Sequence, residues 1–243
     1  MFYFEIFVIS TILSAFFALG GVGSATAMVP IMHFLGIEFN FAKAIGLFVN
    51  TSTTITATIM NLKRKVLDIK FALPLAVSLA AFAPLGALYS KKIPVHEVKW
   101  LFAVFLLFSA TMIIFGKKEQ KFHYNKQWLM VLIGSIVGFI SGLLGIGGGA
   151  LLMPVLILLG FDAKKLAVTM SFVIPFSTFA AFLTYMSFVK FNWTILFIAA
   201  LGAIIGGYIG NYFMHFKLNQ AQIKKIIGIL LYIIAIKMIW SLL

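Results

Sequence analysis

Two glycine-rich stretches interrupt the apolar runs of the sequence, and their residue types suit the binding of a small anion. They cover residues 19–25 and 142–150. Glycine permits positive φ values and close backbone approach, so one helix can end there and another begin, at about Ser24 and Gly148. The first N–H groups of a new helix lack helical partners and carry the positive end of the helix dipole. Such N–H groups can bind an anion without a charged side chain.

A polar run farther along the chain offers hydroxyl and amide groups. Asn50–Thr54 consists of five consecutive polar residues, which cannot all face the same way on a helix. A single serine or threonine often bonds the carbonyl four residues earlier in its own helix, but in this run some side chains must face the interior. The predicted substrate-binding residues are Gly21, Gly23, Ser24, Asn50, Thr51, Thr54, Gly147, Gly148, Gly149, Thr169 and Ser171.

One histidine and three prolines are candidates for moving parts. His33 lies well inside an apolar segment, and an ionisable residue at membrane depth is a functional candidate. It either carries a proton or hydrogen-bonds between helices. Proline removes a helix hydrogen bond and kinks the helix. We therefore predict hinges at Pro30, Pro154 and Pro175, and we expect the kink at Pro175 to expose a backbone carbonyl.

The elements that carry these residues are hydrophobic. Of the 243 residues, 63% are hydrophobic and 10% are charged, whereas a soluble domain has roughly 25% charged residues. Apolar runs of about 20 residues, the length of a spanning helix, recur along the whole chain. The sequence therefore predicts an all-α, polytopic integral membrane protein.

The charge pattern and the missing residue types exclude several functions. The net charge of +13 comes from short lysine clusters between apolar runs, a pattern of the positive-inside rule rather than of nucleic-acid binding. The chain has no cysteine and no evident metal-ligand cluster, so we expect no cofactor. Ser24 and His33 lie about 13 Å apart along a helix, too far for the nucleophile–base pair of an enzyme.

The chain also repeats itself. A shift of 124 residues places Gly21, Gly23 and Pro30 over Gly145, Gly147 and Pro154, and five of the sixteen positions from Gly21 to Gly36 are identical. We assign residues 1–120 to a first repeat and residues 121–243 to a second, each with about five hydrophobic segments. The ten segments are expected at about residues 3–20, 23–36, 41–61, 69–90, 96–115, 127–144, 147–160, 164–188, 192–213 and 220–241.

The number of crossings depends on the two short segments, 23–36 and 147–160. They either cross the bilayer or dip in and return, which gives eight to ten transmembrane helices. If all ten cross, 13 of the 19 lysine and arginine residues lie on one side, with Lys43 among the six on the other. The positive-inside rule then favours ten crossings with both termini outside. Five crossings per half would make the repeats inverted, as in many secondary transporters.

The second glycine-rich motif resembles a known family. The sequence Gly-Ile-Gly-Gly-Gly-Ala-Leu-Leu-Met-Pro at residues 145–154 precedes Leu-Leu-Gly-Phe at 158–161 and Ala-Val-Thr-Met-Ser at 167–171. This pattern resembles the sulfite exporter TauE/SafE family (the four-toluene-sulfonate uptake permeases) over essentially the whole chain. A degenerate copy at residues 20–36 resembles the first-half motif, with Ser-Ala-Thr where more glycine is usual.

The resemblance implies a multi-pass transporter of sulfur-containing anions, such as sulfite, thiosulfate or organosulfonates, in the inner membrane of a bacterium or archaeon. An anion agrees with the residues, since no segment carries an acidic side chain deep in the membrane. We expect a secondary transporter that alternates its access around a midplane anion site. The alternatives are an anion channel and a membrane assembly factor without transport. The expected partners are the anion and the lipid bilayer, not nucleic acid, and the apolar surface is compatible with a homo-oligomer.

Overall fold

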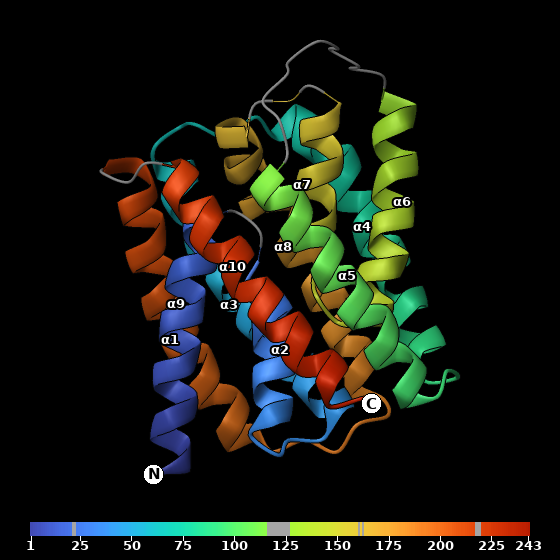
Figure 1. Ribbon diagram of the computed structural model, residues 1–243. Helices are drawn as coiled ribbons and strands as arrows, with labels where there is room; N and C mark the ends of the chain where they lie inside the picture. Colours follow the sequence, from blue (N-terminus) through green and yellow to red (C-terminus); the bar gives the residue numbers. More distant parts are fainter. Residues whose placement is uncertain (21–22, 116–126, 160, 162, 217–219) are drawn as a thin grey trace.

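The computed structural model describes residues 1–20, 23–115, 127–159, 161, 163–216 and 220–243. Within these residues the chain forms ten α-helices and no β-strand (Figure 1), which confirms the all-α prediction. The helices are α1 (Phe2–Gly20), α2 (Ala25–Phe34), α3 (Phe39–Lys63), α4 (Ile69–Ser90), α5 (Val95–Phe115), α6 (Gln127–Leu144), α7 (Gly149–Leu158), α8 (Ala163–Met186), α9 (Trp193–Phe216) and α10 (Gln220–Trp240).

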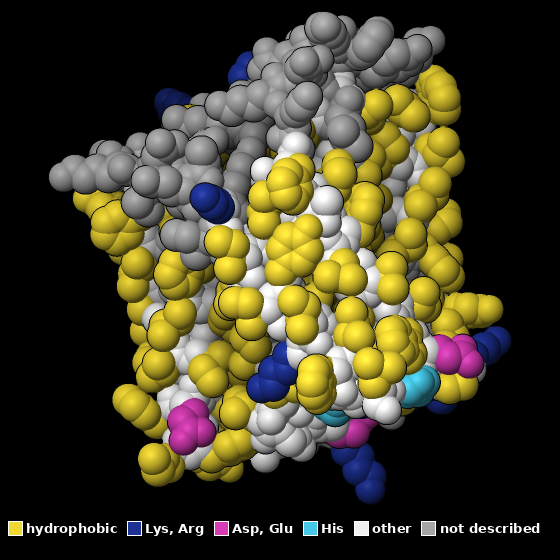
Figure 2. All heavy atoms as spheres, in the orientation of Figure 1, with side chains coloured by type: hydrophobic (Ala, Val, Ile, Leu, Met, Phe, Trp, Pro, Cys, Tyr) yellow, Lys and Arg dark blue, Asp and Glu magenta, His cyan; other side chains and the backbone are white. Residues whose placement is uncertain are grey.

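Six of the described helices are long and apolar enough to cross a membrane, namely α1, α4, α5, α6, α8 and α9. Their outer faces expose large hydrophobic side chains, such as Leu101 and Val104 on α5, which are 50% and 60% exposed. Figure 2 shows hydrophobic side chains over the middle of the visible face, and acidic side chains near its lower end. An apolar surface of this extent fits contact with lipid, so the protein is a multi-pass membrane protein.

The two short helices are the second arms of hairpins. α1 rises from the N-terminus and α2 returns toward the same end, whereas α6 descends from the opposite end and α7 returns to it (Figure 1). α2 and α7 have ten residues each, or about 15 Å, which is half of the hydrocarbon core. The breaks at Gly23–Ser24 and Gly145–Gly148 are buried. Each short helix therefore starts inside the molecule, and its main contact is with the helix that follows it, α3 for α2 and α8 for α7.

Close helix contacts connect the first five helices with the last five. α1 packs on α9, α4 on α6, α3 on α8 and α5 on α10. Glycine makes two of these contacts possible. A Cβ atom on Gly86 would collide with the Phe139 carbonyl oxygen of α6, and one on Gly206 would collide with the Thr11 carbonyl oxygen of α1. The helices of the two halves of the chain are thus interleaved in one bundle.

α3 is the polar centre of the bundle. Its 25 residues extend about 37 Å, enough to cross a bilayer, but its asparagine and threonine residues lower its hydropathy. Fifteen of these residues are buried, against α8, α9, α2 and α1. Because these neighbours shield α3 from lipid, it can carry polar side chains at membrane depth. α3 thereby positions the residues described next.

Candidate substrate-binding site

Asn50 on α3 joins the two glycine-rich breaks. Its side chain is fully buried, and its Oδ1 accepts a hydrogen bond of 3.1 Å from the Ser24 backbone N–H. A Cβ atom on Gly23 would lie 2.9 Å from Asn50 Nδ2, and one on Gly147 would lie 2.5 Å from the same atom. Both glycines have positive φ values, 90° and 79°. The backbone of each break therefore touches the Asn50 amide, and a larger residue at either place would displace it.

Among the residues that the structure describes, the buried amide nitrogen of Asn50 has no hydrogen-bond partner. Buried donors in proteins almost always have a partner, and an unpaired one costs about 1–3 kcal/mol. This nitrogen lies beside Gly147, two residues before α7 begins, and α2 begins two residues after Gly23. An unsatisfied donor between two helix N-termini is a place where an anion would be stabilised.

Hydroxyl groups from α1, α3 and α8, and from Ser24 at the start of α2, lie near Asn50. Thr53 Oγ1 donates to Ser14 Oγ at 2.9 Å and lies 3.5 Å from Ser24 Oγ. Thr51 donates to Thr178 Oγ1 on α8 at 2.7 Å. A hydroxyl can serve as donor or acceptor, so these groups can reorient toward a bound molecule.

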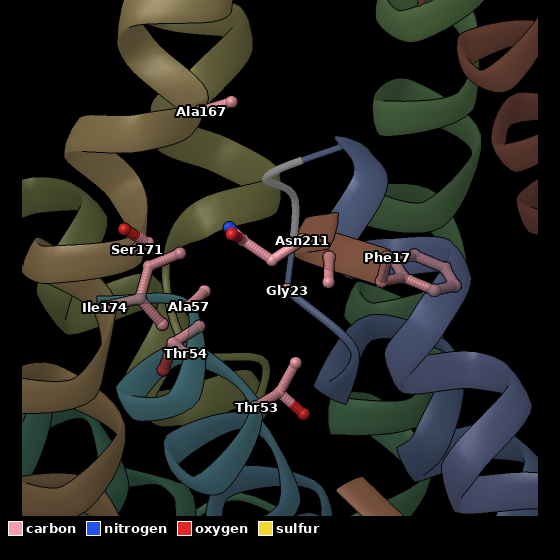
Figure 3. Close-up of a pocket in the computed structure, with 10 residues that line it drawn as sticks. Phe17, Gly23, Thr53, Thr54, Ala57, Ala167, Ser171, Ile174 and Asn211 are labelled. Atoms are coloured by element: carbon pink, nitrogen blue, oxygen red, sulfur yellow. The ribbon is translucent and has the colours of Figure 1, made fainter. Parts of the chain in front are cut away.

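A cavity of about 20 Å³ lies beside this cluster (Figure 3). This volume holds about one water molecule, so a larger solute needs the helices to move apart. No acidic side chain lines it. The lining residues are Phe17, Ala18, Gly23, Thr53, Thr54, Ala57, Ala167, Ser171, Ile174 and Asn211.

The proline in α8 explains a second link between α3 and α8. Pro175 has no N–H for the carbonyl of Ser171, four residues earlier. The Thr58 hydroxyl of α3 donates to that carbonyl at 2.5 Å, and Asn61 Nδ2 donates to Ser171 Oγ at 3.0 Å. The exposed carbonyl thus has a partner on α3.

Replacing Thr58 with valine should lower the free energy of unfolding by about 1–3 kcal/mol, because the Ser171 carbonyl would lose its partner inside the bundle. Thr56→Val is the matched control, since the Thr56 hydroxyl is also half-buried and bonds the Ser52 carbonyl of its own helix. Unfolding in mixed detergent micelles measures both. Equal losses in the two variants would show that the link to α8 contributes nothing.

Several predicted residues do not reach Asn50. Gly148 has a positive φ of 75°, but a Cβ atom there would meet Leu79 Cδ2 on α4 at 2.7 Å. Gly149 is the first residue of α7, and its N–H donates to the Gly147 carbonyl. The Thr169 hydroxyl donates to the Lys165 carbonyl of its own helix. Gly21 lies outside the described residues. The structure thus brings Gly23, Ser24, Asn50, Thr51, Thr54, Gly147 and Ser171 together.

The predicted proton carrier His33 and two of the predicted hinges, Pro30 and Pro154, lie farther away, whereas Pro175 lies beside Ile174 of the cavity lining. His33 Nδ1 lies 3.0 Å from the Ile37 carbonyl oxygen at the end of α2, the opposite end from Ser24. Pro30 and Pro154 each occupy the sixth position of their helix, α2 and α7. Proton coupling by His33 and bending at the three prolines stay predictions.

The structure adds residues that the sequence did not indicate. Thr178 faces Thr51, and Asn211 lines the cavity and accepts a hydrogen bond of 3.1 Å from Arg64 Nη1. Asn211 follows Gly210 in an apolar segment, where an isolated amide is a signal that could have found it. Thr178 had no such signal, because hydroxyls are common in its segment. Both residues lie on the second half of the chain and reach α3 only through packing.

A bundle of apolar helices around a buried polar centre, with two helices that begin there, is the architecture of a membrane transport protein. Residues 6–238 match the family model described as Sulfite exporter TauE/SafE. The chain therefore belongs to the TauE/SafE family of membrane transporters, as its glycine-rich motifs indicated.

Relatives of this chain occur in bacteria and archaea. The Probable membrane transporter protein YunE of Bacillus subtilis is 26% identical over an alignment that covers 91% of each chain. The Probable membrane transporter protein ORF9 of a Sinorhizobium species is 28% identical over 89% of this chain and 82% of its own. The Probable membrane transporter protein MJ0441 of Methanocaldococcus jannaschii is 27% identical over 70% of this chain and 67% of its own.

Proposed function

We propose that the protein is a secondary transporter of small sulfur-containing anions, such as sulfite, thiosulfate or organosulfonates, in the cytoplasmic membrane. The anion binds between the two glycine-rich breaks, at Asn50. The two sides of the site open in turn. In the orientation that the positive-inside rule favours, both chain termini lie on the non-cytoplasmic side of the membrane.

The observation that carries the proposal is the position of Asn50 Nδ2, a buried donor without a partner where both breaks meet. An oxyanion can accept from this amide and from the N-termini of α2 and α7. The Ser24 and Thr53 hydroxyls can donate as well. Among the described residues no acidic side chain lines the adjoining cavity, which therefore lacks the carboxylates that commonly hold a cation. The donors therefore favour a small oxyanion, and the family description points to sulfite.

The alternation of access is supported by matching contacts in the two halves. When α1–α5 are exchanged in order with α6–α10, the contact of α1 with α9 corresponds to that of α6 with α4, and the contact of α2 with α3 to that of α7 with α8. α1 and α6 begin at opposite ends of the bundle (Figure 1). These relations support an arrangement as inverted repeats, in which an exchange of conformations opens a central site to either side.

A binding and transport assay tests the proposal. Purified protein is heated with sulfite, thiosulfate, sulfate or methanesulfonate, and a ligand of the folded state raises the apparent unfolding temperature. The protein is then reconstituted into liposomes, where a secondary transporter takes up labelled anion faster when unlabelled anion is inside. Uptake that ignores the internal anion, with ionic conductance, would indicate a channel. Stabilisation by none of the four anions would contradict the proposal.

A further inference from the structure

Lys43 is a buried lysine near the start of α3. Its side chain is 0% exposed. Its Nζ donates to Ser90 Oγ at 2.7 Å and to the Leu143 carbonyl oxygen at 3.3 Å, at the ends of α4 and α6. The same atom lies 4.9 Å from the ring centre of Phe39 and 5.6 Å from that of Tyr185. Four elements thus enclose one ammonium group.

All of these partners are uncharged. Within the described part of the chain, no carboxylate stands among the hydrogen-bond partners of Lys43 Nζ. Glu38, the acidic residue nearest in sequence, caps α3 with its two carboxylate oxygens, which accept from Asn40 and Phe41 N–H. Its charge attracts Lys43 without a hydrogen bond between the two side chains. Burial of an ammonium group is costly without an anion beside it. The negative end of the α6 dipole and two aromatic rings offset part of this cost.

Lys43 lies on the line of α3 that carries the candidate site. At 3.6 residues per turn, positions 43, 50, 54 and 61 fall within about 40° of one another around a helix. Lys43 is therefore two turns from Asn50, or about 10 Å along the axis. Its aliphatic chain also touches the break before α7, since a Cβ atom on Gly145 would lie 2.6 Å from Lys43 Cβ.

The related place in the second half of the chain carries no charge. The 124-residue offset of the repeat leads from Lys43 to Ala167, which lines the small cavity next to Asn50. In the first half of the chain this position carries a lysine side chain, and in the second half it carries an alanine beside a cavity of about 20 Å³. Lys43 thus makes the surroundings of Asn50 positive on the side of the chain termini.

We propose that Lys43 is the countercharge of the transported anion, a binding residue that meets the anion on its way between the terminal side and Asn50. The inference rests on the proposed function. In the closed form described here, the Leu143 carbonyl and Ser90 hold the ammonium in place. An anion entering from the terminal side replaces them as its partner, and the Asn50 amide receives the anion next.

The test compares Lys43→Met, Lys43→Arg and Lys99→Met with the wild type. Methionine matches lysine in shape without the charge, and an apolar substitute for a buried charge is often neutral or stabilising, so the variant should fold. Lys99 is the matched control, because its Nζ faces the same Phe39 ring at 5.5 Å from a half-buried position. The measurements are thermal unfolding and the apparent affinity for thiosulfate, sulfite and methanesulfonate.

We expect Lys43→Met to unfold at the wild-type temperature or above it and to bind these anions about tenfold to 100-fold more weakly, the range of a hydrogen bond to a charged group. Lys43→Arg should retain most of the affinity, and Lys99→Met should retain all of it. Since the chain has no cysteine, Lys43→Cys can be alkylated specifically. Bromoethylamine, which restores an ammonium group, should recover affinity, and iodoacetamide should not.

Two results would overturn the assignment. Wild-type anion affinity in Lys43→Met would show that the ammonium does not meet the anion, even if transport occurs. A lowered unfolding temperature with unchanged affinity would make Lys43 a purely structural residue. Absence of anion binding by the wild type itself would instead refute the proposed function, and the countercharge with it.

Discussion

Replacing Gly147 with alanine should lower the rate of anion counterflow by about 100-fold or more, the effect of misplacing a binding group by about 1 Å. The new Cβ atom would lie 2.5 Å from Asn50 Nδ2 and would also collide with the Thr178 methyl group. Asn50 must then move away from the break, and the Thr51–Thr178 hydrogen bond must shift with it. Counterflow in liposomes that contain equal amounts of protein measures the effect.

Two glycines control for the backbone conformation. Gly36 has a φ of 87°, and a Cβ atom there would meet nothing within 4 Å. Gly36→Ala carries the same left-handed strain, about 1–2 kcal/mol, and should keep its transport rate. Gly148→Ala, which would contact Leu79 instead of Asn50, should lose less activity than Gly147→Ala. Wild-type counterflow by Gly147→Ala would separate the break from the binding site.

Replacing Asn50 with aspartate should weaken anion binding by at least about 100-fold. The carboxylate has the shape of the amide and can still accept from Ser24 N–H, but it cannot donate to the anion. It also adds a negative charge at the site. Losing a hydrogen bond to a charged group costs about 1.5–3 kcal/mol, and repulsion between two like charges in a protein interior adds to this.

The control for Asn50→Asp changes the same atoms ten residues earlier. Asn40 is in the first turn of α3 and is half-buried, and a negative charge at a helix N-terminus is favourable. Asn40→Asp should therefore bind anions within about twofold of the wild type, a difference of about 0.4 kcal/mol. Isothermal titration gives both affinities. If Asn50→Asp bound as tightly as Asn40→Asp, the anion could not contact the amide nitrogen.

The sequence predicted the features that depend on neighbouring residues, namely the helices, the glycine-rich breaks and the buried polar run. The ten helices follow from hydrophobic runs and their interruptions, and all ten begin within two residues of the predicted segments. The breaks followed from glycine, because positive φ values at Gly23 and Gly147 are a property of single residues. Asn50 was predicted because five consecutive polar residues cannot avoid the interior. These features depend on composition and spacing, which one sequence contains in full.

The contacts between helices could not be read in the same way. Gly147 and Gly148 are neighbours with similar φ values, yet one touches Asn50 and the other faces Leu79. Lys43 was counted among the charges at the outer surface, because it lies near the start of a segment. It is buried because the ends of α4 and α6, together with α8, meet above it. Such partners are set by packing across the two halves of the chain.

The contact between α1 and α9 has a consequence for synthesis. A Cβ atom on Gly202 would lie 2.5 Å from the Phe7 carbonyl oxygen, and one on Gly206 or Gly210 would collide with the carbonyl oxygen of Thr11 or Ala15. A chain is made from its N-terminus, so α1 enters the membrane about 190 residues before this partner exists. Until then the face of α1 that packs on α9 lacks its partner, although Ser14 can already bond Thr53 of α3. α1 is therefore inserted well before the helix on which it mainly packs, and truncations within α9 should leave it open to degradation.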